Sequence, residues 1–237
     1  MLVTTRAIVL RTVRHGDHKV ILTAWTAHAG VRSYLVRAGG ERGASPATLQ
    51  PLARIELVVD ERADRELHFV REIRVAEPYV RIHTEPVRGT VLLFAQEVLF
   101  KVLRTESPDP GLDAFVHETL QVIDTADDLR CFPLVFLLQL SGHLGFYPEH
   151  PVDEADHFDL QEGSFVNGAA RHGHTMGPPL STALAQLLNV PLQDLSTARM
   201  GAAERASLLD HLLLYHRLHV EGFGELRSVA VLRSVLS

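Results

Sequence analysis

Apolar and polar residues alternate in short runs along the first 80 positions. Residues 52–59 show this pattern most clearly, with Ile55 and Leu57 on one face and Arg54 and Glu56 on the other. Alternation with a period of two is typical of a strand that buries one face. We expect five such strands, at residues 5–13, 20–26, 31–38, 52–59 and 67–75. Five short strands favour a small barrel, and the OB-fold is the commonest five-stranded type.

Beyond Pro78 the apolar residues recur every three or four positions, as Val91, Phe94, Val98 and Val102 do. This spacing predicts helices at residues 86–104, 112–123, 128–144, 181–189, 202–221 and 227–236. The third is apolar on most faces, so we expect it to be the central buried helix, ending at Gly145. The predicted fold class is α+β, with an OB-fold barrel domain at residues 1–80 and a mostly helical domain at 81–237.

Residues 146–180 interrupt the helical pattern. The segment is rich in Pro, Gly and His and has little periodicity. Two short apolar runs, at residues 158–160 and 164–166, could pair as one hairpin. We therefore expect a small irregular β-hairpin insertion within the helical domain.

Charge is distributed unevenly along the chain. The net charge is −6, yet residues 1–54 carry eight basic and two acidic side chains, a balance of +6 that leaves −12 for the remainder. This asymmetry suggests a basic binding surface joined to an acidic body. The alternative interpretation is a solvated basic face without a partner.

The basic residues of the first domain are the candidates for binding nucleic acid. Single-strand binding requires cations that follow the phosphates and aromatic rings that stack on bases. Trp25 is expected in the barrel core rather than at the surface. The predicted DNA-binding residues are Arg11, Arg14, Arg32, Tyr34, Arg37 and Arg42.

Enzyme motifs are missing from the sequence. It contains no GxSxG, P-loop, GxGxxG or HExxH pattern, and its single cysteine, Cys131, excludes an internal disulfide. We expect no catalytic role, no cofactor and no metal. A metal-dependent hydrolase built on His157, His172 and His174 remains the alternative. A transcription regulator would need a basic recognition helix, and the expected helices carry only scattered Arg.

The sequence has no run near the roughly 20 apolar residues of a membrane helix, and its first residues do not follow a signal-peptide pattern. We therefore expect a cytoplasmic protein without a membrane partner.

Several segments together resemble the RecO family of bacterial recombination mediators. They are the opening TTRAIVLRTVRHGDHKVILTAWTAHAGVRSYLVRAGG, then ATLQPLARIELVV, LSGHLGFYPEH, FDLQEGSF and YHRLHVEGFGELRSVAVLRSVL. The resemblance covers nearly the whole chain. Many members carry a four-cysteine zinc site after the Gly-Phe-x-Pro motif, and this chain has no cysteine there. The resemblance thus implies a metal-free variant in which packing of Phe158, Leu160 and Phe165 replaces the ion.

The resemblance also implies a function in DNA repair. RecO-like proteins bind single- and double-stranded DNA, anneal complementary strands, act with RecR, and help load RecA onto strands coated by single-strand binding protein. Such a protein would be associated with the nucleoid. The helical domain would also grip the acidic C-terminal tail of single-strand binding protein. The matching positions are Phe146, Tyr147, Arg217 and His219, although Arg217 could equally be an ordinary surface residue on a structural helix.

Overall fold

The computed structural model describes residues 2–39, 43–61, 65–104, 107–151 and 155–236. They form two compact units. One comprises Met1–Thr84 and Ala95–Val116, and the other comprises Glu85–Phe94 and His117–Ser237. Helices α1 (Pro86–Val102) and α2 (Pro110–Thr125) therefore each contribute residues to both units.

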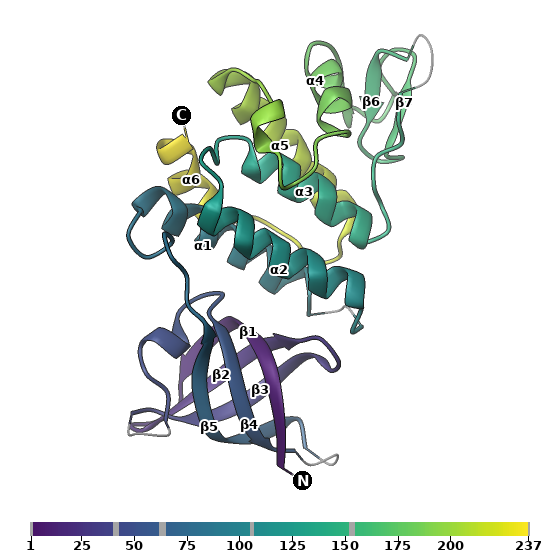
Figure 1. The fold of residues 1–237 in the computed structure, drawn as a ribbon. Coiled ribbons are helices and arrows are strands. Elements are labelled where there is room, and N and C mark those ends of the chain that lie inside the picture. Colours follow the sequence, from purple (N-terminus) through teal and green to yellow (C-terminus); the bar gives the residue numbers. More distant parts are fainter. Residues whose placement is uncertain (1, 40–42, 62–64, 105–106, 152–154, 237) are drawn as a thin grey trace. The chain divides into compact units, whose positions relative to one another are not determined.

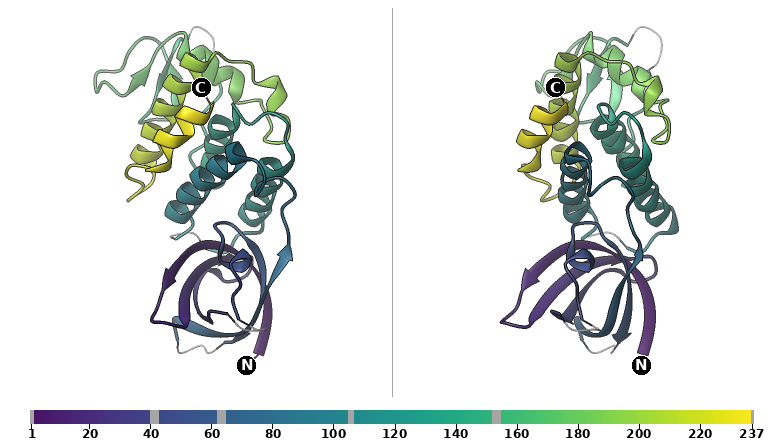
Figure 2. Two further views of the ribbon diagram at one scale, coloured as in Figure 1. Left: turned by 90° about the vertical axis from the view of Figure 1, so that its left-hand side faces the viewer. Right: turned by 60° about the vertical axis from the view of Figure 1, so that its left-hand side comes forward.

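The first unit contains a closed five-stranded barrel (Figures 1 and 2). Neighbouring strands follow the order β1-β2-β3-β5-β4, and β1 pairs with β4 to close the ring. The β3–β5 pair is parallel and the others are antiparallel. The predicted OB-like barrel is confirmed, with strands β1 (Leu2–Arg14), β2 (Lys19–Thr26), β3 (Gly30–Arg37), β4 (Arg54–Asp60) and β5 (Leu67–Glu77), and a short 3-10 helix η1 (Ala47–Leu49).

Side chains that alternate along each strand fill the barrel interior. The interior cluster contains Ala7, Val9, Leu22, Ala24, Tyr34, Val36, Ala44, Ala53, Ile55, Leu57, Val59 and Ile73. Because Ala24 points inward, its neighbour Trp25 lies on the outer face of the barrel. Trp25 is nevertheless buried, and its indole N–H donates a hydrogen bond of 2.9 Å to the Asp113 carboxylate of α2 in the same unit. Trp25 is therefore buried as expected, but on the outer face of the barrel against α2 rather than in the barrel interior.

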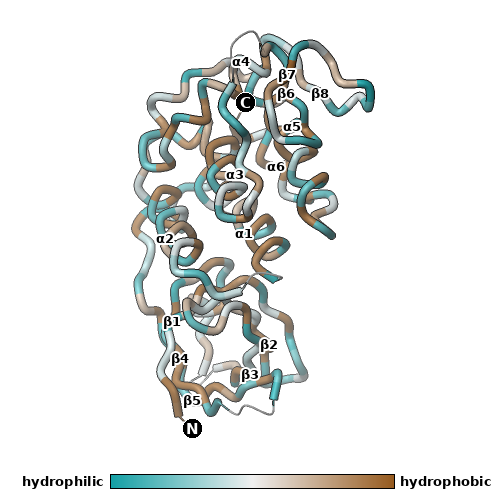
Figure 3. Tube along the Cα trace, turned by 90° about the vertical axis from the view of Figure 1, so that its right-hand side faces the viewer, coloured by the Kyte–Doolittle hydropathy of each residue, from teal (hydrophilic) through white to brown (hydrophobic). Residues whose placement is uncertain are grey.

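The second unit is built around α3 (Phe132–His143), with α4 (Leu180–Leu187), η2 (Leu195–Thr197), α5 (Ala202–His219) and α6 (Ser228–Leu236). Nine of the 12 residues of α3 are buried, and its tube is hydrophobic in colour along most of its length (Figure 3). The ring of Phe136 stacks on Phe132 with centroids 5.4 Å apart and meets Phe94 edge-on. The prediction that α3 is the central buried helix is confirmed.

Gly145 ends α3 through a left-handed turn. Its φ of 85° lies in the region that glycine adopts without strain. The Phe146 amide donates to the Ser141 carbonyl and the Gly145 amide to that of Gly142, which is the Schellman pattern. This turn fixes the direction in which Phe146 leaves the helix.

The irregular segment holds a three-stranded sheet in the order β7-β6-β8. The predicted hairpin is observed as β6 (His157–Asp159) and β7 (Ser164–Val166). Strand β8 (Thr175–Met176) was not predicted, because two residues are too short to show a period. Within the described part of the chain, no helix combines the length and apolarity needed to cross a membrane.

Candidate nucleic-acid surface and partner pocket

Three cations lie on the outer face of strands β1, β2 and β3. Val36 points into the barrel, so Arg37 points outward, and Lys19 is its direct partner across β2 and β3. Arg11 is paired with Thr23, which is paired with Ser33, and this row lies on the same outer face. The strand pairing therefore gathers Arg11, Lys19 and Arg37 on one side of the barrel.

The basic residues of β4 and β5 form ion pairs with acidic side chains, whereas these three cations form none within the described part of the chain. Arg54 pairs with Glu77 at 3.1 Å, Arg71 with Asp60 at 3.3 Å and Arg74 with Glu56 at 2.8 Å. No ion pair among the described residues involves Arg11, Arg14, Lys19, Arg32 or Arg37. Two like charges placed directly opposite each other destabilise a sheet. A bound anion between Lys19 and Arg37 would remove that repulsion.

The structure divides the predicted DNA-binding residues. Arg32 is exposed but lies five positions before Arg37, so the two side chains leave β3 on opposite faces. Arg14 is exposed at the end of β1, and the Arg11 guanidinium lies 5.5 Å from the centre of the Phe100 ring. Arg42 lies outside the described residues.

The prediction that Tyr34 stacks on a base is corrected by its position in the structure. It is 2% exposed and belongs to the barrel interior. Burial, with the charge of Glu61 adding to its effect, raises the pKa of Tyr34 to about 12. A ring enclosed in this way offers no face to a base, so we remove Tyr34 from the candidate surface. Lys19, which sequence reasoning did not select, takes a place in it, and only the cross-strand pairing with Arg37 reveals it.

Two of the four residues expected in the partner-tail pocket come together. The rings of Phe146 and His219 stack with centroids 5.0 Å apart and an interplanar angle of 7°. His219 Nε2 lies 3.0 Å from the Leu160 carbonyl oxygen, and the Tyr215 hydroxyl donates to the Phe146 carbonyl at 2.6 Å. These contacts fill the space around Phe146 with the protein's own side chains.

The other two expected residues lie apart from that cluster. The Tyr147 hydroxyl donates to the Leu188 carbonyl at 2.7 Å. Arg217 is exposed on α5 two positions before His219, and residues two apart on a helix do not share a face. Arg217 and His219 therefore do not form one binding edge.

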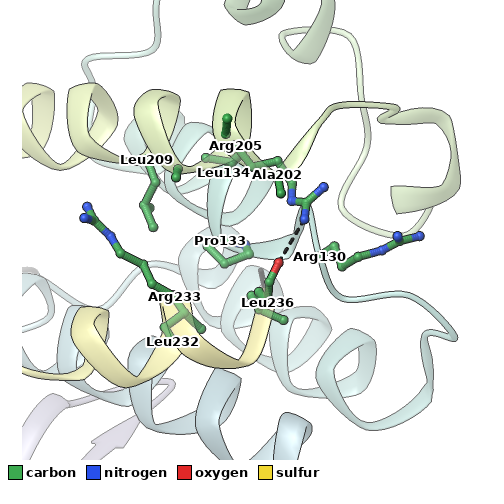
Figure 4. A pocket seen from close by; sticks show the side chains of 11 residues that line it. Arg130, Pro133, Leu134, Ala202, Arg205, Leu209, Leu232, Arg233 and Leu236 are labelled. Carbon is green, nitrogen blue, oxygen red and sulfur yellow. Dashed lines mark hydrogen bonds between the residues drawn. The ribbon is translucent and has the colours of Figure 1, made fainter.

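A cavity of about 280 Å³ opens between the N-terminal ends of α3 and α5 and the helix α6. Its walls are mostly apolar, with three arginines at the margin (Figure 4). We call this space the α3–α5–α6 cavity; its lining residues are Arg130, Pro133, Leu134, Ala202, Ala203, Arg205, Ala206, Leu209, Leu232, Arg233 and Leu236.

The three arginines have different tasks. Arg205 donates to the carbonyl oxygens of Met200 at 2.7 Å and Leu236 at 2.8 Å, so it holds the ends of two segments in place. Arg130 pairs with Asp128 at 2.5 Å, and this hydrogen bond lowers the pKa of the Asp128 carboxyl. Arg233 pairs with Asp210. The guanidinium groups of Arg130 and Arg233 lie at opposite ends of the cavity (Figure 4).

Two histidines of the irregular segment, His157 and His172, lie beside carboxylates. His157 Nδ1 lies 2.6 Å from Asp156, and His172 Nε2 lies 3.0 Å from the buried Asp159. Burial acts to raise the pKa of Asp159, but the amides of Gln161 and Glu162 and then His172 outweigh it and lower the pKa. In the described ranges, no three His, Cys, Asp or Glu side chains are arranged to hold a metal ion. Nothing here supports the hydrolase alternative.

Comparisons with known proteins agree with this architecture. The family described as Recombination protein O N terminal matches residues 1–79, and the one described as Recombination protein O C terminal matches residues 83–228. DNA repair protein RecO of Porphyromonas gingivalis is 30% identical over 99% of both chains, as is that of Bacteroides fragilis. That of Christiangramia forsetii is 28% identical, also over 99% of both chains. With both halves of the fold matched, the chain belongs to the RecO family of DNA repair proteins.

Proposed function

We propose that this protein is a non-enzymatic recombination mediator that binds single-stranded DNA on the outer face of β1, β2 and β3. The observation that carries the proposal is the direct opposition of Lys19 and Arg37, with Arg11 on the same face and no ion pair for these cations among the described residues. Arginine and lysine in this arrangement are suited to successive phosphates. The same surface would bind double-stranded DNA through its phosphates alone.

The mediator role extends this binding to partners. A protein that holds one strand through its backbone leaves base edges free for pairing, which suits annealing of complementary strands. We further propose that it acts with RecR and helps load RecA onto strands coated by single-strand binding protein, in the cytoplasm at the nucleoid. The family membership supports these steps.

The double variant Lys19→Gln and Arg37→Gln tests the DNA surface. Binding to a labelled single strand should weaken about tenfold at low salt, and the salt dependence should flatten by about 0.7 log unit for each phosphate that is no longer neutralised. Fluorescence anisotropy across a salt series measures both quantities. The matched control is Arg6→Gln with Arg74→Gln, since these exposed arginines are held in ion pairs with Glu77 and Glu56. Equal salt slopes for the wild type and the first variant would refute the proposed surface.

We place the tail of single-strand binding protein in the α3–α5–α6 cavity. The cavity combines an apolar interior with Arg130 and Arg233 at its exposed margin. Each of the two is already paired with one carboxylate, Asp128 or Asp210, and would bind the tail through its remaining N–H groups, since a guanidinium carries five. A peptide ending in acidic residues and Pro-Phe has the complementary features, namely an aromatic ring for the apolar space and carboxylates for the arginines. The Phe146–His219 cluster is less suited, because its rings already pack on each other.

Titration of a labelled acidic peptide ending in Pro-Phe distinguishes the two positions. Arg130→Ala should weaken binding about tenfold, the lower end of what a charge-assisted hydrogen bond contributes. Ala206→Leu should weaken it comparably by filling the cavity. Arg217→Ala should bind like the wild type, and none of the three should alter binding of bare DNA. Loss of affinity in Arg217→Ala alone would place the tail on α5 near His219 instead.

A further inference from the structure

Phe69 is an exposed aromatic residue on the barrel that the sequence analysis did not select. It is 43% exposed, whereas its neighbours on β5 are enclosed: His68 is 6% exposed and Val70 packs against the interior cluster. Alternation along the strand therefore points Phe69 outward. A single exposed apolar side chain is common on protein surfaces, but one that belongs to a larger apolar patch points to a binding site.

The strand pairing places Phe69 at the end of an apolar row on the candidate DNA surface. Phe69 is paired with Leu35 on β3, Leu35 with Ile21 on β2, and Ile21 with Val13 on β1. Cross-strand partners lie side by side on one face of a sheet. The row therefore crosses four strands of the barrel, and its two end members, Phe69 and Val13, are both exposed.

Cations flank this row. Lys19 and Arg37 lie two residues along β2 and β3 from Ile21 and Leu35, which is about 7 Å. The Arg65 guanidinium lies 6.0 Å from the centre of the Phe69 ring. Asp60, the cross-strand neighbour of Phe69 on β4, is paired with Arg71 at 3.3 Å, so its negative charge is compensated.

We infer that Phe69 is a base-stacking platform for an unpaired nucleotide whose phosphate lies on the row of Lys19 and Arg37. The inference rests on the proposed single-strand binding and adds to it the residue that contacts a base. A stacked base needs an accessible aromatic ring and cations for the backbone; Phe69 is 43% exposed, and Lys19 and Arg37 flank its row. A duplex keeps its bases stacked on each other, so the platform would favour single strands. Every base has a flat face, so the contact would tolerate any sequence.

Substitutions of Phe69 in the full-length protein test the platform. Phe69→Ala should weaken binding to a single strand containing the fluorescent base 2-aminopurine by about 5- to 150-fold, the range for removing one base–aromatic stack. The salt slope should stay unchanged, because stacking releases no counterions. Phe69→Leu, which keeps the apolar contacts of the barrel, should lose most of this affinity, and Phe69→Trp should restore it. Val80→Ala, a 77% exposed residue beyond β5, is the matched control.

The results separate this inference from the function on which it rests. A duplex of the same length should bind equally to the wild type and to Phe69→Ala. The quenching of 2-aminopurine fluorescence should be lost in Phe69→Ala and Phe69→Leu, which lack an aromatic ring, and kept in Phe69→Trp. Wild-type affinity in Phe69→Ala, or an equal loss for duplex, would overturn the platform and leave the cationic surface standing. A wild-type protein that binds no single strand would overturn both.

Discussion

Replacing Phe158 by alanine is expected to lower the free energy of unfolding of the helical unit by about 3–5 kcal/mol. The side chain is fully buried on β6, with its ring 5.1 Å from that of Phe165 and 5.6 Å from that of Tyr215 on α5. Removing it opens a cavity where the small sheet joins α5, so the destabilisation combines reduced apolar burial with unfilled space.

Urea unfolding followed by circular dichroism measures this destabilisation. Phe158→Leu preserves much of the volume and should destabilise less. Asn167→Ala, an exposed change just after β7, should stay within about 0.5 kcal/mol of the wild type. A change below about 1 kcal/mol for Phe158→Ala, well under the cost of emptying a core site, would show that the apolar contacts do not hold this segment on α5.

Acid should destabilise the protein through His216. Burial, with the charge of His219 adding to it, lowers the pKa of His216 to about 4. Its Nδ1 lies 3.0 Å from the Leu212 carbonyl, and its buried Nε2 has no partner, so a proton there would have no acceptor. The pKa of His216 is lower in the folded state than in the unfolded chain, so below about pH 6.5 the unfolded chain binds a proton that the folded protein does not. The free energy of unfolding is therefore highest above about pH 6.5 and decreases as the pH falls toward 4. The loss amounts to about 3 kcal/mol.

Comparing variants across pH isolates this contribution. His216→Leu removes the titrating group and should flatten the fall of stability between about pH 6.5 and 4 by about 3 kcal/mol relative to the wild type. Phe223→Leu alters a ring 5.3 Å from the same imidazole; it should lower stability at every pH and leave the slope unchanged. Parallel curves for the wild type and His216→Leu would show that His216 does not govern the acid response.

The irregular segment illustrates what the local pattern could reveal. The hairpin was predictable from two short apolar runs, and its apolar side chains Phe158, Leu160 and Phe165 are buried as expected. The carboxylate of Asp159, which binds the turn amides and His172, was not anticipated. Its partner His172 lies 13 residues further along the chain, and no local period links the two.

The DNA surface shows the same division. The excess of basic residues in the first 54 positions is visible in the sequence. The face of the barrel on which each of these side chains lies is not. Only the register of β2 and β3 places Lys19 opposite Arg37, and Arg32 leaves the strand on the other side. On β5, His68, Phe69 and Val70 are all compatible with burial, so alternation alone could not say which faced outward. The pairing of β5 with β3 places His68 beside the interior residue Tyr34, so Phe69 points outward to the solvent.

By itself, the sequence determined the five barrel strands, the central helix α3 and the glycine that ends it, because periods of two and of three to four residues record which side of each element is buried. The tertiary structure alone decided which residues meet. Tyr34, for example, lies in the barrel interior and packs with the interior cluster. The α3–α5–α6 cavity is lined by residues from the turn before α3 and from the helices α3, α5 and α6, which are far apart in the sequence. Such contacts depend on how elements pack over long separations in the chain, and a local period carries no information about them.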